Sequence, residues 1–212
     1  MEVVRVTVWN VGFEGFDGEA EARLRKTALQ LFASLGYDST TTDMLVEAAG
    51  VDHGTVLKAG GKSGLYRATM EYTNDLLTRA TREALARVKP DVDGLHQLVD
   101  YQLDFYFEHP EVLFLWAHRS LSDAADLTDI EERYSAPLHD LLEEAFDGTQ
   151  LLDRTEYRLT ANVFNWCLRG FMIGGVHLLD GSVLGPDDPG LRDAFRAYMH
   201  RLLDAMRPAG GY

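Results

Sequence analysis

Six side chains around two short predicted helices could form hydrogen bonds with a nucleic acid. The helices are expected at about 42–49 and from just after Asp52 to Gly60-Gly61. Hydroxyl, imidazole and ammonium groups on short exposed helices can contact base edges, and Lys and Tyr can also contact phosphates. We expect four residues at the base edges of a major groove and two on phosphates, namely Thr42, His53, Thr55 and Lys58, and then Lys62 and Tyr66.

The turn between these helices has the residue types of a helix-turn-helix. Gly50 can end the first helix, Val51 can lock the pair together, and Asp52 can cap the second. Thr41 is placed to cap the first helix, and a longer helix at about 20–35 precedes both. These segments predict a three-helix DNA-reading unit.

A second set of residues has the composition of a small-molecule site. Aromatic side chains are dense between the fourth and eighth predicted helices, and polar side chains lie among them. An apolar cavity with a few convergent polar groups is typical of an effector site, although aromatic stripes at helical spacing are also typical of a core. The residues that we expect at a ligand are Tyr101, Phe105, Trp116, His118, Asn162, Trp166 and His177.

The sequence does not support a catalytic or metal-binding interpretation. It contains no HExxH, GxSxG, P-loop or paired-glycine dinucleotide motif, and no two His are spaced as metal ligands on one helix face. Cys167 is the single cysteine, which excludes an intrachain disulfide, and its apolar surroundings are typical of an inert core thiol. We expect no catalytic residue, no metal and no cofactor.

The charge balance is acidic and opposes broad affinity for nucleic acid. The 212 residues carry 34 Asp plus Glu against 20 Lys plus Arg, a formal net charge of −14. Residues 19–66 hold five basic and six acidic side chains, a net charge of −1. Phosphate neutralisation drives DNA binding, so binding to an operator requires that Arg25, Lys26, Lys58 and Lys62 cluster.

The N-terminal segment and the longest apolar stretch bear on location. A single cysteine and the lack of a basic segment followed by an apolar one favour the cytoplasm. The apolar stretch 162–179 contains Arg169, so we expect no membrane span. Val4, Val6 and Val8 alternate with polar residues as in a strand, which leaves a flexible arm, an added edge strand and a mis-assigned gene start as open alternatives.

Apolar periodicity after residue 18 predicts an all-α fold of about nine helices. The parts are an arm at 1–18, a helix-turn-helix domain at 19–66 and a ligand-binding and dimerisation domain at 67–212. The longer helices are expected at about 63–88, 93–109, 111–120, 129–146 with a kink at Pro137, 155–180 and 189–207.

The last two predicted helices have the pattern of a subunit interface. Residues Leu159, Trp166 and Ile173 recur every seven positions on one face of the helix at 155–180, and a second apolar face runs beside it. A helix that is apolar on both faces is buried on both. We expect a homodimer through the last two helices of each subunit, with an ordinary two-sided core helix as the alternative.

At residues 24–72 the sequence resembles the TetR family of one-component transcriptional regulators. The likeness is carried by Ala28, Leu31-Phe32, Gly36-Tyr37, Thr41-Thr42, Leu45, Ala48-Ala49-Gly50-Val51, Gly54-Thr55, Lys62 and Leu65-Tyr66. In that family an aromatic-rich segment follows the Gly-Thr pair, contacts phosphates and packs the recognition helix onto the core. The corresponding segment here, 56–62, is one residue short and lacks both aromatics.

The resemblance implies a homodimeric regulator, a repressor in the leading interpretation, that binds a palindromic operator and is released by a small apolar or aromatic ligand. The alternative is a small-molecule-binding protein or biosynthetic enzyme with the same fold and a degenerate helix-turn-helix. A protein-binding co-regulator is a third reading, and it would expose an apolar patch.

Overall fold

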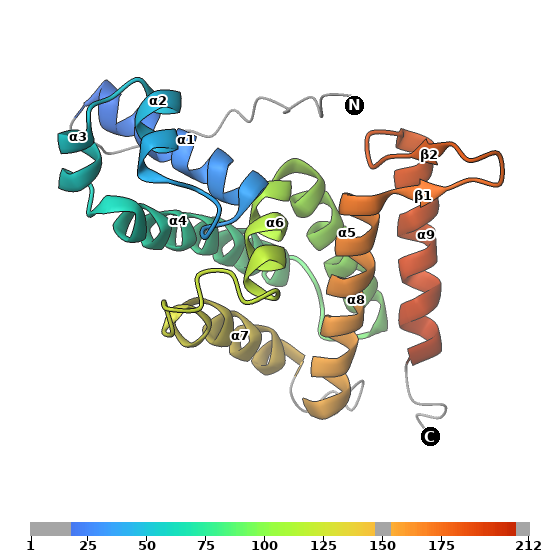
Figure 1. The fold of residues 1–212 in the computed structure, drawn as a ribbon. Helices are drawn as coiled ribbons and strands as arrows, with labels where there is room; N and C mark the ends of the chain where they lie inside the picture. The colour runs from blue at the N-terminus through green and yellow to red at the C-terminus, as the bar shows by residue number, and fades with distance from the viewer. Residues whose placement is uncertain (1–17, 147–153, 207–212) are drawn as a thin grey trace. The chain divides into compact units, whose positions relative to one another are not determined.

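A computed structural model describes residues 18–146 and 154–206, and the chain divides into two compact units at residues 1–69 and 70–212 (Figure 1). Within the described residues the structure is all-α with nine α-helices, one π-helical turn and one two-stranded hairpin. The N-terminal arm and its strand-like pattern lie outside the described residues. Helix α4 (Gly61–Leu85) contributes residues to both units, so each unit is described separately.

The first unit contains α1 (Glu19–Leu35), α2 (Thr42–Ala49), α3 (His53–Lys58) and the start of α4. The expected caps are confirmed, because Thr41 Oγ1 accepts from the Met44 amide at 3.2 Å and Asp52 Oδ1 accepts from the Thr55 amide at 2.7 Å. Gly50 ends α2 in the left-handed conformation, with φ of 63°. Local capping chemistry therefore builds the two-helix unit at the predicted positions.

The connection from α3 to α4 consists of two left-handed glycines. Gly60 and Gly61 have φ of 89° and 67°, values that L side chains rarely adopt. Helix α4 consequently starts at Gly61, two residues before the start that the sequence predicted. The tandem glycines allow the chain to reverse directly after a six-residue helix.

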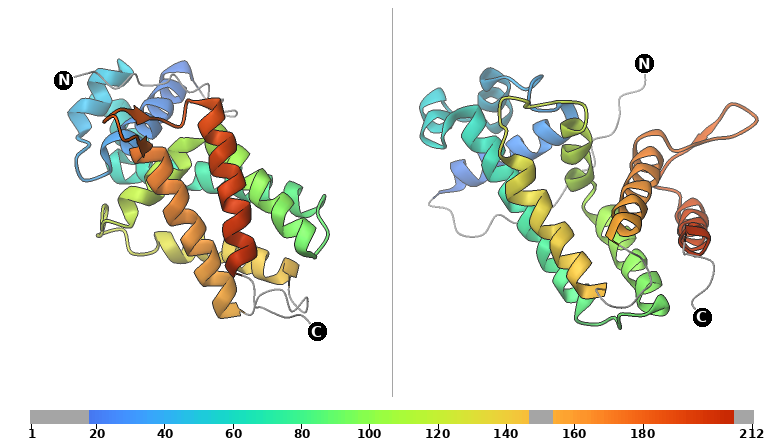
Figure 2. Two further views of the ribbon diagram at one scale, coloured as in Figure 1. Left: turned by 90° about the vertical axis from the view of Figure 1, so that its right-hand side faces the viewer. Right: turned by 90° about the horizontal axis from the view of Figure 1, so that it is seen from below.

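The second unit contains α5 (Val92–Glu108), α6 (Pro110–Arg119), α7 (Ala136–Phe146), α8 (Arg154–Gly174) and α9 (Pro189–Met206). Helices α8 and α9 lie side by side (Figure 2). Their shared core includes Phe171 stacked on Phe195 with ring centroids 4.2 Å apart. Buried residues of α5, α6, α8 and α9 join this core, namely Leu95, Val99, Leu103, Leu113, Leu168, Met172, Met199 and Leu203.

Two predicted helix boundaries were wrong. Helix α8 ends at Gly174 rather than near Asp180, because left-handed Gly175 turns the chain into a short antiparallel hairpin, β1 (Val176–His177) and β2 (Val183–Leu184). The helix expected at 129–146 divides into a π-helical turn (Glu131–Ser135) followed directly by α7. The wider turn lies just before Pro137, which cannot donate to the helical ladder.

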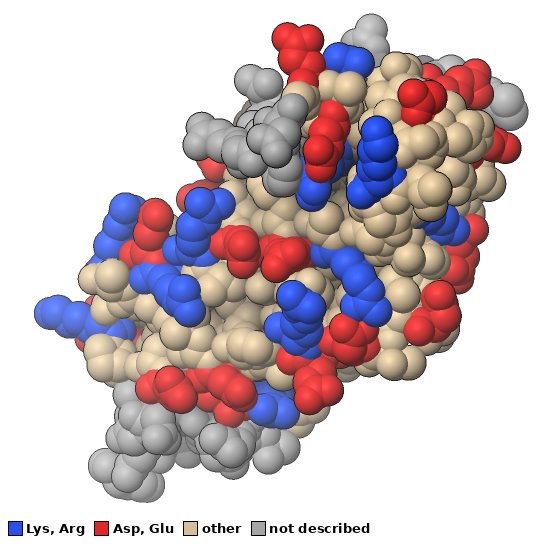
Figure 3. Space-filling model, turned by 90° about the vertical axis from the view of Figure 1, so that its left-hand side faces the viewer, with Lys and Arg blue, Asp and Glu red and all other residues tan. Residues whose placement is uncertain are grey.

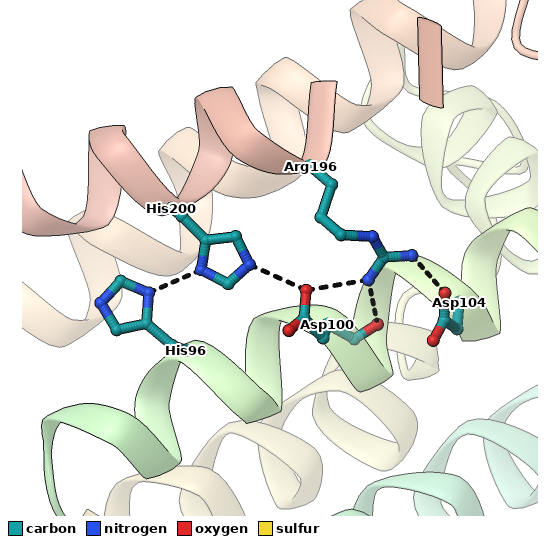
Figure 4. A network of polar contacts seen from close by, with 5 residues as sticks. All are labelled: His96, Asp100, Asp104, Arg196 and His200. Carbon is teal, nitrogen blue, oxygen red and sulfur yellow. Dashed lines mark hydrogen bonds and ion pairs between the residues drawn. The ribbon is translucent and has the colours of Figure 1, made fainter. Parts of the chain in front are cut away.

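A row of polar contacts fastens α5 to α9 (Figure 4). Asp100 Oδ1 accepts from Arg196 Nη1 and from His200 Nε2, both at 2.8 Å, and Arg196 also pairs with Asp104. His200 Nδ1 lies 2.6 Å from His96 Nδ1, and the two rings are stacked. Burial alone would raise the pKa of Asp100, but hydrogen bonds and charge from Arg196 and His200 lower it below its ordinary value.

The buried guanidinium of Arg119 holds the irregular segment that follows α6 through hydrogen bonds to its backbone. Arg119 donates to the carbonyls of Asp123, Ala124 and Leu127 at 3.0, 2.5 and 3.3 Å. It also forms a bidentate ion pair with the Glu131 carboxylate, at 2.8 and 2.6 Å. This segment includes left-handed Ala124, whose side chain is buried. Across residues 18–146 and 154–206, no helix combines the length and apolarity that crossing a bilayer requires.

Candidate nucleic-acid interface and ligand cavity

The exposed face of α2 and α3 carries four of the predicted DNA-contacting residues, and two of these are engaged within the protein. His53 Nε2 lies 2.8 Å from Asp43 Oδ1. The Thr55 hydroxyl donates to Asp52 Oδ1 at 3.1 Å. The Asp52 pKa is lowered, first by the Thr55 backbone hydrogen bond and then by the Thr55 hydroxyl. Lys58 is exposed at the last turn of α3, and Thr42 is half-buried at the start of α2.

The structure corrects the placement of Tyr66. Its side chain is 0% exposed and meets Phe32 and Tyr37 edge to face, with centroids 5.2 and 4.9 Å away. A ring at the centre of the first unit's core cannot reach a phosphate. The Lys62 ammonium lies 4.1 Å over the Tyr37 ring, so Lys62 is held beside this aromatic group by a cation–π contact.

The surface of the helix-turn-helix carries few basic side chains, and acidic side chains lie among them. Figure 3 shows, on the face it displays, Lys and Arg side chains interspersed with Asp and Glu rather than gathered in a continuous basic area. On α3, Leu57 is 76% exposed where the related family has an aromatic phosphate contact. A phosphate backbone would therefore meet few cations here, which predicts modest affinity with a shallow salt dependence.

The second unit encloses a cavity of about 450 Å³, a size typical of small-molecule sites. Apolar side chains from α4, α5, α6, α7 and α8 form most of its wall, namely Leu77, Leu95, Leu98, Val99, Leu113, Trp116, Leu138, Leu142, Phe164, Trp166 and Leu203 of α9. Polar and charged side chains from the same helices, such as Gln102, Asn165 and Arg169, lie among these apolar groups. The cavity can therefore hold a molecule that has both an apolar body and a polar group.

Three buried polar atoms of the cavity lining have no hydrogen-bond partner among the described residues. Arg169 Nη1 donates to Ser120 Oγ at 2.6 Å, while its buried Nε has no hydrogen-bond partner among the described residues. The same holds for Tyr157 Oη and His139 Nδ1. Burial raises the pKa of Tyr106 to about 12, raises that of Tyr157 and lowers that of His139. The two tyrosines and His139 can therefore donate to or accept from a ligand while staying neutral at pH 7.

Three of the seven residues predicted at a ligand line this cavity, namely Trp116, Asn162 and Trp166. The others lie elsewhere. Phe105 is buried against Leu77 and Val112, Tyr101 and His118 are not among the lining residues, and His177 is exposed in β1 rather than on a helix.

Sequence reasoning missed the charged lining residues, Arg119, Glu131 and Arg169. The signal for Arg169 was available, because a cation within an apolar helix that does not cross a membrane requires a specific environment. Arg119 and Glu131 carried no comparable pattern, since their pairing joins positions twelve residues apart across an irregular segment.

An apolar stripe on α8 is left uncovered within the described chain. Leu159, Trp166 and Ile173 are spaced by seven residues, and the last two are 60% and 62% exposed. Tyr198 of α9 is also exposed. Monomeric proteins rarely leave large apolar groups in a row on a surface, so this stripe is a candidate interface. Among residues 18–146 and 154–206, no three His, Cys, Asp or Glu side chains are grouped so as to hold a metal ion.

The first unit thus has the fold of a helix-turn-helix, and the second contains a cavity of its own. Residues 24–69 match the family described as "Bacterial regulatory proteins, tetR family". The chain thus carries the TetR-family helix-turn-helix at these residues and has the TetR fold. No curated protein shows significant sequence similarity to it.

Solved structures with the same fold include several regulators. A putative TetR-family transcription regulator from Shewanella sp. PV-4 aligns with a TM-score of 0.68 and 16% identity, covering 91% of this chain and 100% of that one. The ketosteroid transcriptional regulator KstR2 of Mycobacterium tuberculosis gives 0.67 and 14%, covering 92% and 98%. The fatty acid degradation regulator FadR from Bacillus halodurans gives 0.61 and 17%, covering 89% and 96%.

Proposed function

We propose that this protein is a homodimeric transcriptional repressor that acts in the cytoplasm and leaves its operator when a small ligand fills the cavity of the second unit. The capped α2–turn–α3 arrangement supports this proposal most directly, because Thr41, Gly50 and Asp52 each supply the local chemistry of a helix-turn-helix. The cavity supports the ligand response, with Trp116, Asn162 and Trp166 as contact residues.

The exposed stripe on α8, with Tyr198 of α9, supports the dimer. Two copies of this stripe facing each other would form a four-helix interface of the last two helices from each subunit. A dimer presents two copies of α3, which read half-sites about 34–36 Å apart, or a multiple of that distance. A ligand that favours a different α3-to-α3 spacing would release the DNA by shifting the population of dimers.

The test is selection of DNA by the full chain. Purified protein is incubated with random duplexes at about 50 mM salt, since low salt favours phosphate contacts, and bound duplexes are amplified over repeated rounds. Enrichment of a palindrome supports the repressor. If the protein is dimeric by size measurement and still enriches no sequence, sequence-specific DNA binding is excluded from the proposal.

A second candidate function is a ligand-binding protein or enzyme that no longer reads DNA. Three features of the first unit favour it, namely buried Tyr66, exposed Leu57 and the His53–Asp43 pair on the reading face. The two candidates differ in one measurement. A ligand that displaces protein from an enriched operator supports the repressor, whereas a ligand that is bound or converted by a protein without an operator supports the second candidate.

A further inference from the structure

We propose that the ligand of the cavity is an amphipathic organic anion, with its negative group at Arg169 and an apolar body among the leucine and phenylalanine side chains. This inference rests on the proposed ligand-binding role of the cavity and deepens it by naming the chemical class. It does not depend on DNA binding by the first unit.

The first argument is the charge of the wall. Three lining residues carry full charges at neutral pH, and two of them, Arg119 and Glu131, neutralise each other through their two-pronged ion pair. Arg169 remains, and among the described residues it has no ion pair. The cavity therefore carries a net positive charge within a protein of net charge −14, which selects for an anion.

The second argument is the state of the Arg169 side chain. Burial lowers its pKa, and the interaction with Tyr106 opposes that effect only in part. Its Nη1 donates to the neutral Ser120 hydroxyl, and its Nε has no partner. A partly desolvated cation with unused donors is costly, and a carboxylate offsets this cost because it accepts two N–H groups of a guanidinium at once. A neutral ligand could accept one hydrogen bond but could not supply the missing charge.

The third argument is the remainder of the lining. Apart from Arg169 and the paired Arg119 and Glu131, no lining residue carries a charge that could bind the far end of a dianion or a zwitterion. Tyr157 lines the same cavity and has a buried, unpartnered hydroxyl. The arrangement fits one anionic group and one apolar chain or ring system, in a space of about 450 Å³.

The test uses three probes of equal length and different charge, namely octanoate, 1-octanol and octylammonium. Each is titrated into the full chain by isothermal calorimetry, with tryptophan fluorescence as a second readout because Trp116 and Trp166 line the cavity. We expect octanoate to bind about 10- to 100-fold more tightly than 1-octanol, as a charged hydrogen-bonded contact would give. We expect octylammonium to bind most weakly.

Substitutions assign the preference to one side chain. R169Q should weaken octanoate by about 10- to 100-fold and weaken 1-octanol much less, because the alcohol loses at most a neutral hydrogen bond. R169K should retain part of the preference because it keeps the charge. R158Q is the matched control, since Arg158 lies on the same helix, pairs with Glu143 and does not line the cavity. A161W, which fills the cavity, should abolish binding of both probes.

Each outcome supports or overturns the inference. Equal affinity for the acid and the alcohol in the unaltered protein overturns it, as does failure of both to bind below about 1 mM. Retention of the acid preference in R169Q overturns the assignment to Arg169, and measurable 1-octanol binding shows that this variant is folded. Should R169Q not fold, the comparison of the three probes on the unaltered protein and on R169K still decides the question. No DNA is present, so a failed operator selection leaves this result intact.

Discussion

The contacts of Asp100 predict a defined loss of stability when its carboxylate is removed. In D100A, Arg196 and His200 each lose an acceptor at 2.8 Å. A hydrogen bond to a charged group contributes about 1.5–3 kcal/mol, but the Asp100 side chain is partly exposed and solvent screening reduces this contribution. Two such contacts at roughly 1 kcal/mol each give a loss of about 2 kcal/mol. For a chain of this size, that corresponds to a fall in Tm of about 4–8 °C.

The pH dependence of this loss follows from the direction of the pKa shift. The pKa of Asp100 is lower in the folded protein than the ordinary value of 3.8. Its stabilisation is therefore fully present above 3.8 and is lost as the pH falls through the folded-state pKa. The difference in stability between the unaltered protein and D100A should therefore not shrink from pH 7 to about pH 5, and it should narrow only below 3.8.

The measurement is urea unfolding followed by circular dichroism, at several pH values, for the unaltered protein, D100A and D140A. Asp140 is an exposed carboxylate 3.9 Å from Arg158, so its removal should change stability by less than about 0.5 kcal/mol. If D100A lost no more unfolding free energy than D140A, the Asp100 contacts between α5 and α9 would contribute nothing to stability. If the stability difference between the unaltered protein and D100A already shrank between pH 7 and pH 5, the assignment to Asp100 would be refuted.

Three further predictions test the other parts of the molecule. K58A should weaken operator binding and reduce the slope of log K against log salt by about 1 in filter-binding titrations, because one phosphate contact is lost; an unchanged slope would place Lys58 away from DNA. I173D should halve the particle mass in light scattering, whereas L121D, at an even more exposed apolar residue outside the stripe, should not. G94A should destabilise the protein by about 1–3 kcal/mol in thermal unfolding, because the added Cβ would lie 1.8 Å from the Lys89 carbonyl oxygen. The control Q97A, on the exposed face of α5, should have no measurable effect.

The helix-turn-helix could be predicted from sequence because its determinants are local. A hydroxyl or carboxylate one residue before a helix, and glycine after it, satisfy backbone groups within the same few residues. Thr41, Asp52, Gly36 and Gly50 lie at the predicted helix ends for this reason.

The position of Tyr66 could not be predicted in the same way. Periodicity shows that α4 has a buried side, but which residue meets the core depends on where Phe32 and Tyr37 lie, and those come from a different segment. The end of α8 was missed because the apolar run continues past Gly174 into the hairpin, and apolar content does not distinguish a helix from a strand.

The candidate cavity was predicted in part. Dense aromatic residues with polar residues among them pointed to Trp116, Trp166 and Asn162, which line the cavity. The charged and unpartnered groups that give the cavity its selectivity are defined by contacts between distant segments, such as Arg169 with Ser120, and no spacing in the chain encodes these.

Arg119 connects the wall of the cavity with the irregular segment that follows α6. The same guanidinium that holds Glu131 on the wall also holds three carbonyls of the segment that follows α6. We expect a ligand that displaces Glu131 to change the contacts of that segment as well, because Arg119 binds both. A dye attached through a cysteine introduced at Leu121, whose side chain lies almost wholly in water, would then change its emission as the cavity fills.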